Sequence, residues 1–180
     1  SSTLGTDNPV YAEALKTSAL VNTELGNYDK AERYLEIASD IWARKLGTTK
    51  NTNSAEIKLI LGDVKVRKKD YEAAKTEYTE ARRIYKNLFN KQHPDYISSV
   101  ARLGRVAFMM DNLPKSIKYT EEALANHKEV IQKYFRAMSE AEKSKFWSSI
   151  RTDYEFYNTL AVTASKKKKE MLGKMYDNTI

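Results

Sequence analysis

The chain has 180 residues, enough for one or two domains with a buried core, and its 6 Gly and 3 Pro are few for that length. Because Ala, Leu, Lys and Glu are plentiful, helix is favoured over strand or disorder. The absence of Cys excludes disulfides, thiol nucleophiles, Cys-based zinc sites and iron–sulfur clusters. The net charge of +7 is spread along the chain, which permits an acidic partner without identifying one. With no apolar run of membrane-span length and no visible signal peptide, we expect a cytoplasmic protein that contacts no membrane.

The first eight residues combine the end of one helix with the start of another. Leu4-Gly5 lies 42 residues before Leu46-Gly47, and Asn8-Pro9 corresponds to His93-Pro94 further along. A leucine and a glycine followed by a polar turn and a proline are typical of a helix stop and a new helix start. We therefore interpret residues 1–8 as the tail of a preceding repeat, and we expect the chain to be a piece of a longer array.

A repeating pattern follows. The segment GNYDKAE at 26–32 recurs as KDYEAAK at 69–75 and, more distantly, as DNLPKSI at 111–117. Small residues recur at three positions of each copy: Ala19, Gly62 and Gly104; Ala31, Ala74 and Ser116; Ala38, Ala81 and Ala123. A large residue at such positions would push two helices apart. We therefore expect the first two sets where the helices of a hairpin cross, and the third set where a hairpin meets the next one.

Each unit is predicted to form a hairpin of two helices. The unit boundaries are 9–51, 52–93 and 94–137. The predicted helix ranges are 9–25 and 28–46, 53–68 and 71–89, and 94–110 and 113–137. Pro9, Pro94 and Pro114 fall in first turns, where proline removes no hydrogen bond. No hairpin can bury its apolar faces alone, so the units are expected to stack into a solenoid.

Residues 138–180 depart from this pattern and are predicted to form a C-terminal helical pair. Ser139 and Glu142 make a capping-box motif, with Ser139 as the N-cap. An amphipathic helix should follow to about residue 164, and a second helix from about residue 167. The expected apolar stripe of the first helix is Trp147, Ile150, Tyr154, Tyr157 and Ala161. The run of four lysines at 166–169 is interpreted as the solvated junction between the two helices.

The repeating units resemble the tetratricopeptide repeat, in the 42-residue form found in kinesin light chains and many bacterial regulators. The family's aromatic at the start of the first helix is replaced in the three units by Leu15, Lys58 and Val100. The third unit also has Leu113 in place of the turn tyrosine seen at Tyr28 and Tyr71. The resemblance implies an all-α fold, a right-handed α-α superhelix of three helical hairpins plus the C-terminal helical pair.

The segments 138–161 and 166–180 resemble the helical region that joins a tetratricopeptide array to a CHAT domain, which is a caspase-like cysteine peptidase domain. The matching residues are Ser139, Glu140, Lys143, Phe146, Trp147, Phe156, Tyr176, Asp177 and Asn178. The resemblance implies a bacterial-type protein whose catalytic His and Cys lie outside this chain.

No catalytic, metal or cofactor site is expected in the chain. His93 precedes a proline at a unit junction, and His127 has no second ligand one turn further on, so neither suggests convergent ligands. Glu121-Glu122 is interpreted as solvated charge, because paired-carboxylate chemistry needs two carboxylates facing across a cleft. The lysine run at 166–169 lacks aromatic stacking partners, so nucleic acid is not expected as a partner.

The resemblance implies that the first helix of each unit lines a concave groove, and this groove is the candidate site. The candidate residues are Lys16, Leu20, Leu59, Asp63, Val66, Arg105 and Phe108. Relatives that hold a terminal carboxylate use a clamp of Lys and Asn. Lys16 fits one clamp position, but Leu20 and Ile60 occupy others, so no carboxylate clamp is predicted. The apolar candidates suggest a strip covered by a partner helix or peptide, or by neighbouring elements of the same protein.

We expect a non-catalytic protein–protein interaction scaffold that needs no cofactor. In one hypothesis it recruits a partner to an adjacent CHAT domain of the same polypeptide, or restrains that peptidase. The alternative is a free-standing adaptor that binds a peptide or helix in its groove, as kinesin light chains do. A third hypothesis, a basic nucleic-acid binder, requires converging phosphate contacts that the sequence does not indicate.

Overall fold

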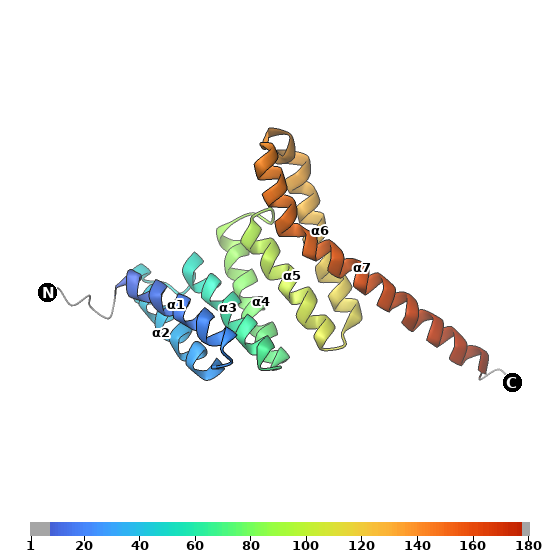
Figure 1. The fold of residues 1–180 in the computed structure, drawn as a ribbon, viewed down its shortest axis with the longest axis horizontal. Coiled ribbons are helices and arrows are strands. Elements are labelled where there is room, and N and C mark those ends of the chain that lie inside the picture. Colours follow the sequence, from blue (N-terminus) through green and yellow to red (C-terminus); the bar gives the residue numbers. More distant parts are fainter. Residues whose placement is uncertain (1–7, 178–180) are drawn as a thin grey trace.

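The computed structural model describes residues 8–177, and side chains as far as Lys167. Within this part the chain forms seven α-helices and one 3-10 helix (Figure 1). Their bounds are α1 Pro9–Glu24, α2 Tyr28–Leu46, α3 Thr52–Arg67, α4 Tyr71–Leu88, α5 Pro94–Met109, α6 Leu113–Tyr134, η1 Phe135–Ala137 and α7 Glu140–Asp177. The predicted tail of a preceding repeat, residues 1–8, lies outside the described residues except for Asn8.

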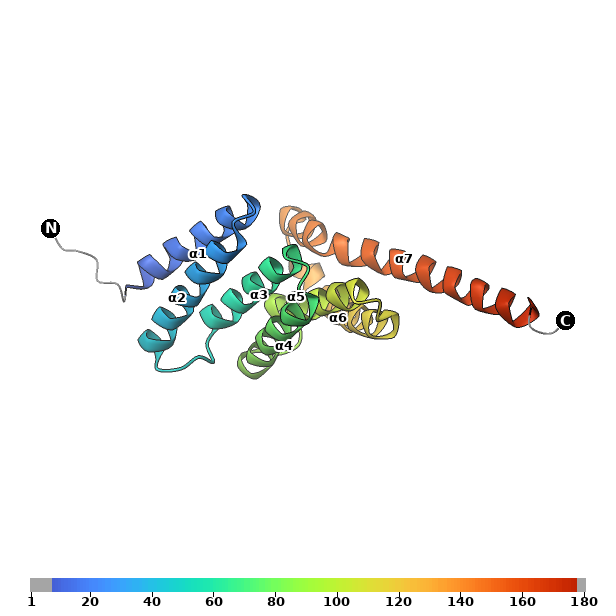
Figure 2. The same ribbon diagram turned by 90° about the horizontal axis from the view of Figure 1, so that it is seen from below.

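Three helical hairpins stack side by side, as predicted. The helices α1 and α2, α3 and α4, and α5 and α6 pair within hairpins, and α2–α3, α4–α5 and α6–α7 contacts join neighbours. The stack is visible from two directions, with α7 packed beside α6 and its C-terminal part projecting beyond the array (Figures 1 and 2). The all-α solenoid expected from the repeats is therefore confirmed, and no helix within residues 8–177 has an apolar stretch long enough to cross a bilayer.

The first helix of every hairpin is capped by the residue before it. The side chains of Asn8 and Asn51 accept hydrogen bonds from the backbone N–H groups of Val10 and Ser54, each at 2.8 Å. In the third unit the Nδ1 atom of His93 takes this role. Such caps satisfy N–H groups that the helix itself leaves unpaired, and they fix where each helix begins.

One turn geometry closes all three hairpins. Gly26, Lys69 and Asp111 occupy equivalent positions and have φ angles of 79°, 62° and 55°. In each turn the next residue's N–H bonds to the carbonyl five residues back, from Asn27 to Asn22 for instance at 2.8 Å. This left-handed conformation costs a residue with a side chain about 1 kcal/mol, so the shared turn is maintained by its hydrogen bonds even where glycine is absent.

The hairpins cross where the small residues were predicted. Gly62 lies against the ring of Tyr78, and a methyl group added at Gly62 would overlap that ring. At Gly104, the Ser116 hydroxyl donates to the glycine carbonyl at 2.8 Å. In the first hairpin Ala19 stands at this position and is fully buried. The prediction of close crossings is confirmed.

Two clusters of buried side chains run through the stack. One joins α1, α2 and α3, and the other joins α3 to α4, α5 and α6. Ala38, Ala81 and Ala123 are all fully buried, as expected for positions where a hairpin meets its neighbour. Because α3 contributes to both clusters, its face toward α2 and its face toward α4 and α5 are both buried.

The predicted C-terminal helical pair is wrong in one respect, because Glu140–Asp177 is a single helix. The sequence contains neither Gly nor Pro from 140 to 172, and the lysine run at 166–169 consists of good helix formers, so nothing interrupts the helix. The start was correctly predicted. The backbone N–H of Ser139 donates to Glu142 Oε2 at 2.8 Å, and the Glu142 N–H donates back to Ser139 Oγ at 3.3 Å.

The apolar stripe predicted for α7 is rotated relative to the buried face. Ile150 is buried and Tyr157 is half-buried, but Trp147 is 49% exposed and Ala161 is exposed. The buried face is instead centred on Ile150, Asp153 and Leu160. A polar residue lies at its centre, which a search for apolar periodicity could not anticipate.

Candidate binding groove

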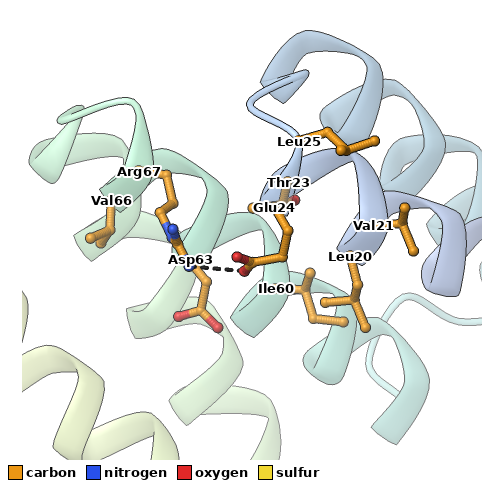
Figure 3. A pocket seen from close by; sticks show the side chains of 9 residues that line it. All are labelled: Leu20, Val21, Thr23, Glu24, Leu25, Ile60, Asp63, Val66 and Arg67. Atoms are coloured by element: carbon orange, nitrogen blue, oxygen red, sulfur yellow. Dashed lines mark hydrogen bonds and ion pairs between the residues drawn. The ribbon is translucent and has the colours of Figure 1, made fainter.

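An open groove lies between α1 and α3. It has a volume of about 600 Å³ and is lined by Leu20, Val21, Thr23, Glu24, Leu25, Ile60, Asp63, Val66 and Arg67 (Figure 3). Leu20, Val21 and Leu25 are exposed large apolar side chains, and Ile60 closes the opposite wall. Covering this apolar surface with a second apolar surface removes both from water and is therefore favourable in free energy.

The polar groups of the groove already have partners within the protein. Glu24 and Arg67 form an ion pair across the groove at 2.8 Å, shown by the dashed line in Figure 3. Asp63 accepts from the Tyr78 hydroxyl at 2.7 Å and from Arg102 Nε at 2.9 Å. Burial, together with the negative charge of Asp63, raises the pKa of the Tyr78 hydroxyl. Asp63 is therefore a structural acceptor that joins α3, α4 and α5.

Lys16 also makes internal contacts. Its ammonium group lies 2.8 Å from Glu13 and 2.8 Å from Glu56, and so links α1 to α3. Burial disfavours its charge, but the hydrogen bonds to Glu13 and Glu56 outweigh burial and raise the pKa of Lys16. Because the two carboxylates of Glu13 and Glu56 neutralise the positive charge of Lys16, this lysine attracts a ligand carboxylate only weakly.

The structure separates the predicted apolar candidates. Leu20 lines the open groove, and Val66 is half-buried at its edge. Leu59 is only 7% exposed and packs in the cluster shared with α4 and α5, so it offers almost no surface to a partner. The groove wall is formed by the next residue, Ile60, which is 9% exposed and otherwise packs in the cluster shared with α1 and α2.

The other two candidates, Arg105 and Phe108, are half-buried and contact α7. Arg105 Nη2 donates to Asp153 Oδ1 at 2.6 Å, and the ring of Phe108 packs edge-on against Phe156 at 5.7 Å between centroids. Both contacts join the first helix of the third unit to α7. The predicted strip is thus open between α1 and α3 and occupied by the chain itself between α5 and α7.

A buried polar cluster holds α7 in place. Asp153 binds Arg105 through one carboxylate oxygen and His127 Nε2 through the other, at 3.0 Å. Burial opposes the charge of Asp153, but the hydrogen bond from His127 and the charge of Arg105 lower the pKa of this carboxyl. The cluster joins α5, α6 and α7, and it lines a second hollow of about 600 Å³. No group of three or more His, Asp or Glu side chains in the described part of the chain is placed to hold a metal ion.

Several of these residues were missed by the sequence analysis. Ile60, Glu24 and Arg67 could have been found from their helical spacing around Leu20 and Asp63. The pairing of Asp153 with His127 had no sequence signal, because the two residues lie on different helices 26 positions apart.

Comparison with a family model decides the nature of the repeats. The model described as Tetratricopeptide repeat matches residues 52–129. Residues 52–129 are tetratricopeptide repeats. The match covers α3 to α6, and the first hairpin repeats the same small residues, caps and turn. No curated protein sequence matches the chain.

Three solved structures share the fold of this chain. BtubC (BKLC) from P. vanneervenii has a TM-score of 0.64 and 20% identity, over 94% of this chain and 66% of that chain. A putative kinesin light chain of Podosopora anserina has a TM-score of 0.60 and 14% identity, over 88% of this chain and 77% of the other. MamA has a TM-score of 0.51 and 19% identity, over 91% of this chain and 83% of its own. At these identities the likeness establishes the tetratricopeptide fold alone, and this chain spans about two thirds of BtubC.

Proposed function

We propose that the chain is a non-catalytic protein–protein interaction scaffold that binds a peptide or an amphipathic helix in the α1–α3 groove. Tetratricopeptide folds are typically non-catalytic, and they generally bind proteins or peptides. The observation that carries the proposal is the exposure of Leu20, Val21 and Leu25 beside Ile60 in one groove.

The chemistry of the groove favours apolar side chains in the partner. Its charged residues are neutralised internally, by the Glu24–Arg67 ion pair and by the contacts of Asp63 with Tyr78 and Arg102. An exposed ion pair contributes about 1 kcal/mol or less, so we expect the Glu24–Arg67 pair to affect the orientation of a bound partner more than its affinity. A groove of this kind suits a helix whose apolar side chains recur every three or four residues.

Replacement of Leu20 by Glu tests this proposal. Leu20 is exposed, so the change should leave the helical circular dichroism and the melting temperature nearly unchanged. Peptides of 16 residues selected from a displayed library against the native protein should bind L20E at least tenfold more weakly, because a charge then lies in the groove.

The matched control is Val162→Glu, at an exposed apolar position on α7 that lies outside the groove. Selected peptides should bind V162E as tightly as the native chain. Equal binding to the native protein and to L20E would show that the groove is not the binding site. Leu59→Asp is unsuitable for this purpose, because it would place a charge in the core.

A narrower proposal concerns the polypeptide around this chain. The order of motifs from Ser139 to Asn178 resembles the segment before a CHAT domain, and we propose that the array recruits a partner to such a peptidase or restrains it. The side chains from 168 onward lie outside the described residues, and the family match at 52–129 leaves this segment out. The coding sequence downstream of Ile180 tests the proposal: it should encode a domain with a His and a later Cys, and its absence would remove this proposal while leaving the groove untouched.

A further inference from the structure

The contacts between α5 and α7 leave a hollow beside them, the α5–α7 hollow, whose lining is completed by residues of α6 and by Asp63 of α3. Its volume of about 600 Å³ equals that of the α1–α3 groove, and Asp63 is the one residue that lines both. Pockets that hold a ligand have volumes of roughly 300–1,000 Å³. The hollow is therefore large enough for a binding site of its own, and its lining differs from that of the groove.

The apolar part of the lining comes from α5, α6 and α7. Ile97, Ala101 and Ile150 are buried, whereas Val130 and Phe146 are half-buried and so retain surface that a ligand can cover. Such a lining suits the methylene stem of a long side chain, because the stem packs on apolar atoms while the polar end reaches charged residues.

The charged part of the lining consists of three aspartates and two arginines, in a chain whose net charge is +7. Arg102 pairs with Asp63 at 2.9 Å, and Arg105 pairs with Asp153 at 2.6 Å. Each guanidinium group is therefore balanced by one carboxylate. The fifth residue, Asp95, supplies an excess negative charge.

The carboxylate of Asp95 has no cation beside it within the described residues. Its side chain is 46% exposed, and the basic group within reach is the His93 ring, whose Nδ1 atom lies 3.7 Å from the carboxylate. That nitrogen accepts a hydrogen bond from the backbone N–H of Asp95 at 3.3 Å. An accepting ring nitrogen carries no proton, so His93 offers Asp95 no positive charge.

A second hydrogen-bond acceptor in the lining lacks a partner. His127 is 7% exposed, and its Nε2 atom lies 3.0 Å from Asp153. Because an ionised carboxylate can only accept, Nε2 carries the proton, and Nδ1 of the neutral ring is then an acceptor. This Nδ1 atom is buried and has no hydrogen-bond partner within the described residues. The hollow thus favours a ligand that donates hydrogen bonds.

A cation that follows an apolar stem matches this lining. A guanidinium group has five N–H donors and no acceptor, which suits a site with an unpaired carboxylate and an unpaired ring nitrogen. We propose that the α5–α7 hollow binds an arginine side chain of a protein partner, with its stem against Val130 and Phe146 and its charge at Asp95. The site does not depend on the apolar side chains of the α1–α3 groove.

Two short peptides with blocked ends test the hollow directly. Acetyl-Ala-Arg-Ala-amide and acetyl-Ala-citrulline-Ala-amide have nearly the same shape, but citrulline carries no charge. In a titration of the isotope-labelled 180-residue chain followed by NMR, the arginine peptide should shift the backbone amide signals of Ile97, Ala101 and Ile150 in a saturable manner at millimolar concentration. The citrulline peptide should bind about fivefold more weakly, because it lacks the ion pair.

Asp95→Asn removes the excess charge and keeps the size of the side chain. It should weaken the arginine peptide by about fivefold and leave the helical circular dichroism unchanged. The matched control is Glu13→Gln, whose side chain is equally exposed at 46% and lies outside the hollow. Leu20→Glu should also bind the arginine peptide as the native chain does, so a failure of the groove proposal and a failure of this one can be told apart.

Three results would overturn the proposal. The first is equal binding of the arginine and citrulline peptides, or the absence of saturable shifts at the amides of the hollow. The second is unchanged binding of the arginine peptide by Asp95→Asn. The third is tighter binding of acetyl-Ala-Glu-Ala-amide, which would make the guanidinium groups of Arg102 and Arg105 the recognition elements.

Discussion

At each hairpin crossing, one small residue faces one side chain whose size differs between units. The pairs are Gly62 with Tyr78 and Gly104 with Thr120, and the equivalent positions of the first unit hold Ala19 and Leu35, each pair sixteen residues apart. The largest side chain, Tyr78, goes with glycine because its ring occupies the space of a methyl group at position 62. The size of the two residues is therefore matched locally, unit by unit.

Gly62→Ala should destabilise the protein despite the better helix propensity of alanine. The propensity gain is about 0.5–1 kcal/mol, whereas overpacking a buried site costs about 1–3 kcal/mol. Tyr78 is 2% exposed and its hydroxyl is hydrogen-bonded to Asp63, so its ring cannot move aside freely. We expect the free energy of unfolding in urea to fall by about 1–2 kcal/mol.

The double variant Gly62→Ala with Tyr78→Leu reproduces the pair of the first unit. It should recover most of the stability lost by Gly62→Ala alone, because leucine leaves room for the methyl group. A double variant less stable than the single one would contradict the matching of sizes at the crossing.

At the level of the helices, ion pairs join successive first helices of the hairpins. Lys16 to Glu56 links α1 with α3, Arg102 to Asp63 links α5 with α3, and Arg105 to Asp153 links α5 with α7. By these contacts α7 takes the place that a fourth first helix would have. Its junction with α6 differs from the others, since His127 replaces the aromatic of α2 and α4.

Asp153→Asn should weaken the docking of α7 in a pH-dependent manner. At neutral pH the loss of the charge leaves Arg105 and His127 with a weaker partner, and we expect a loss of about 1–3 kcal/mol. The folded protein lowers the pKa of Asp153, so its contribution is present above the unfolded carboxyl pKa of about 3.9 and is lost as the pH falls through the lower folded value.

The measurement is unfolding in urea between neutral pH and about pH 2, followed by Trp147 fluorescence in a Trp42→Phe background that leaves a single tryptophan. The stability gap between the parent and D153N should be constant near neutral pH and should narrow as the pH falls below about 3.9 toward the lower folded pKa of Asp153. A gap that stays constant over this range would show that Asp153 does not stabilise the fold through its charge.

For the whole molecule, the two ends of the solenoid differ within the described residues 8–177. At the C-terminal end, α7 covers Phe108 and the buried face of α6 around Ala123 and His127. At the other end, the α1 side chains of Val10, Tyr11 and Val21 are exposed. The array therefore depends on α7 to shield apolar surface that its last hairpin cannot bury alone.

Removal of residues 139–180 should lower the melting temperature and increase the binding of a hydrophobic dye, because it exposes this surface. Truncation after Lys167 is the matched control, since Ile150, Asp153 and Leu160, which form the buried face of α7, all remain. We expect the control to behave as the full chain does. Equal melting temperatures for all three proteins would contradict a stabilising role for α7.

Much of the local structure was predictable because it depends on residues close together in the chain. The bounds of the six hairpin helices agree with the prediction within three residues, and the capping box at Ser139 and Glu142 forms as its motif predicts. The continuous helix at 166–169 was missed because the change of pattern there was taken for a break, although no helix-breaking residue is present.

The sequence by itself determined the repeats, the caps, the small residues at the crossings and hence the all-α solenoid, because these features arise from hydrogen bonds and steric contacts between near neighbours. Only the tertiary structure decided that Leu59 is buried while Ile60 lines the groove, that Arg105 and Phe108 contact α7, and that Asp153 meets His127. These outcomes depend on the angles at which the helices cross and on side chains contributed by other helices. For the same reason, the open groove between α1 and α3 could be located only once the neighbouring hairpins were in place.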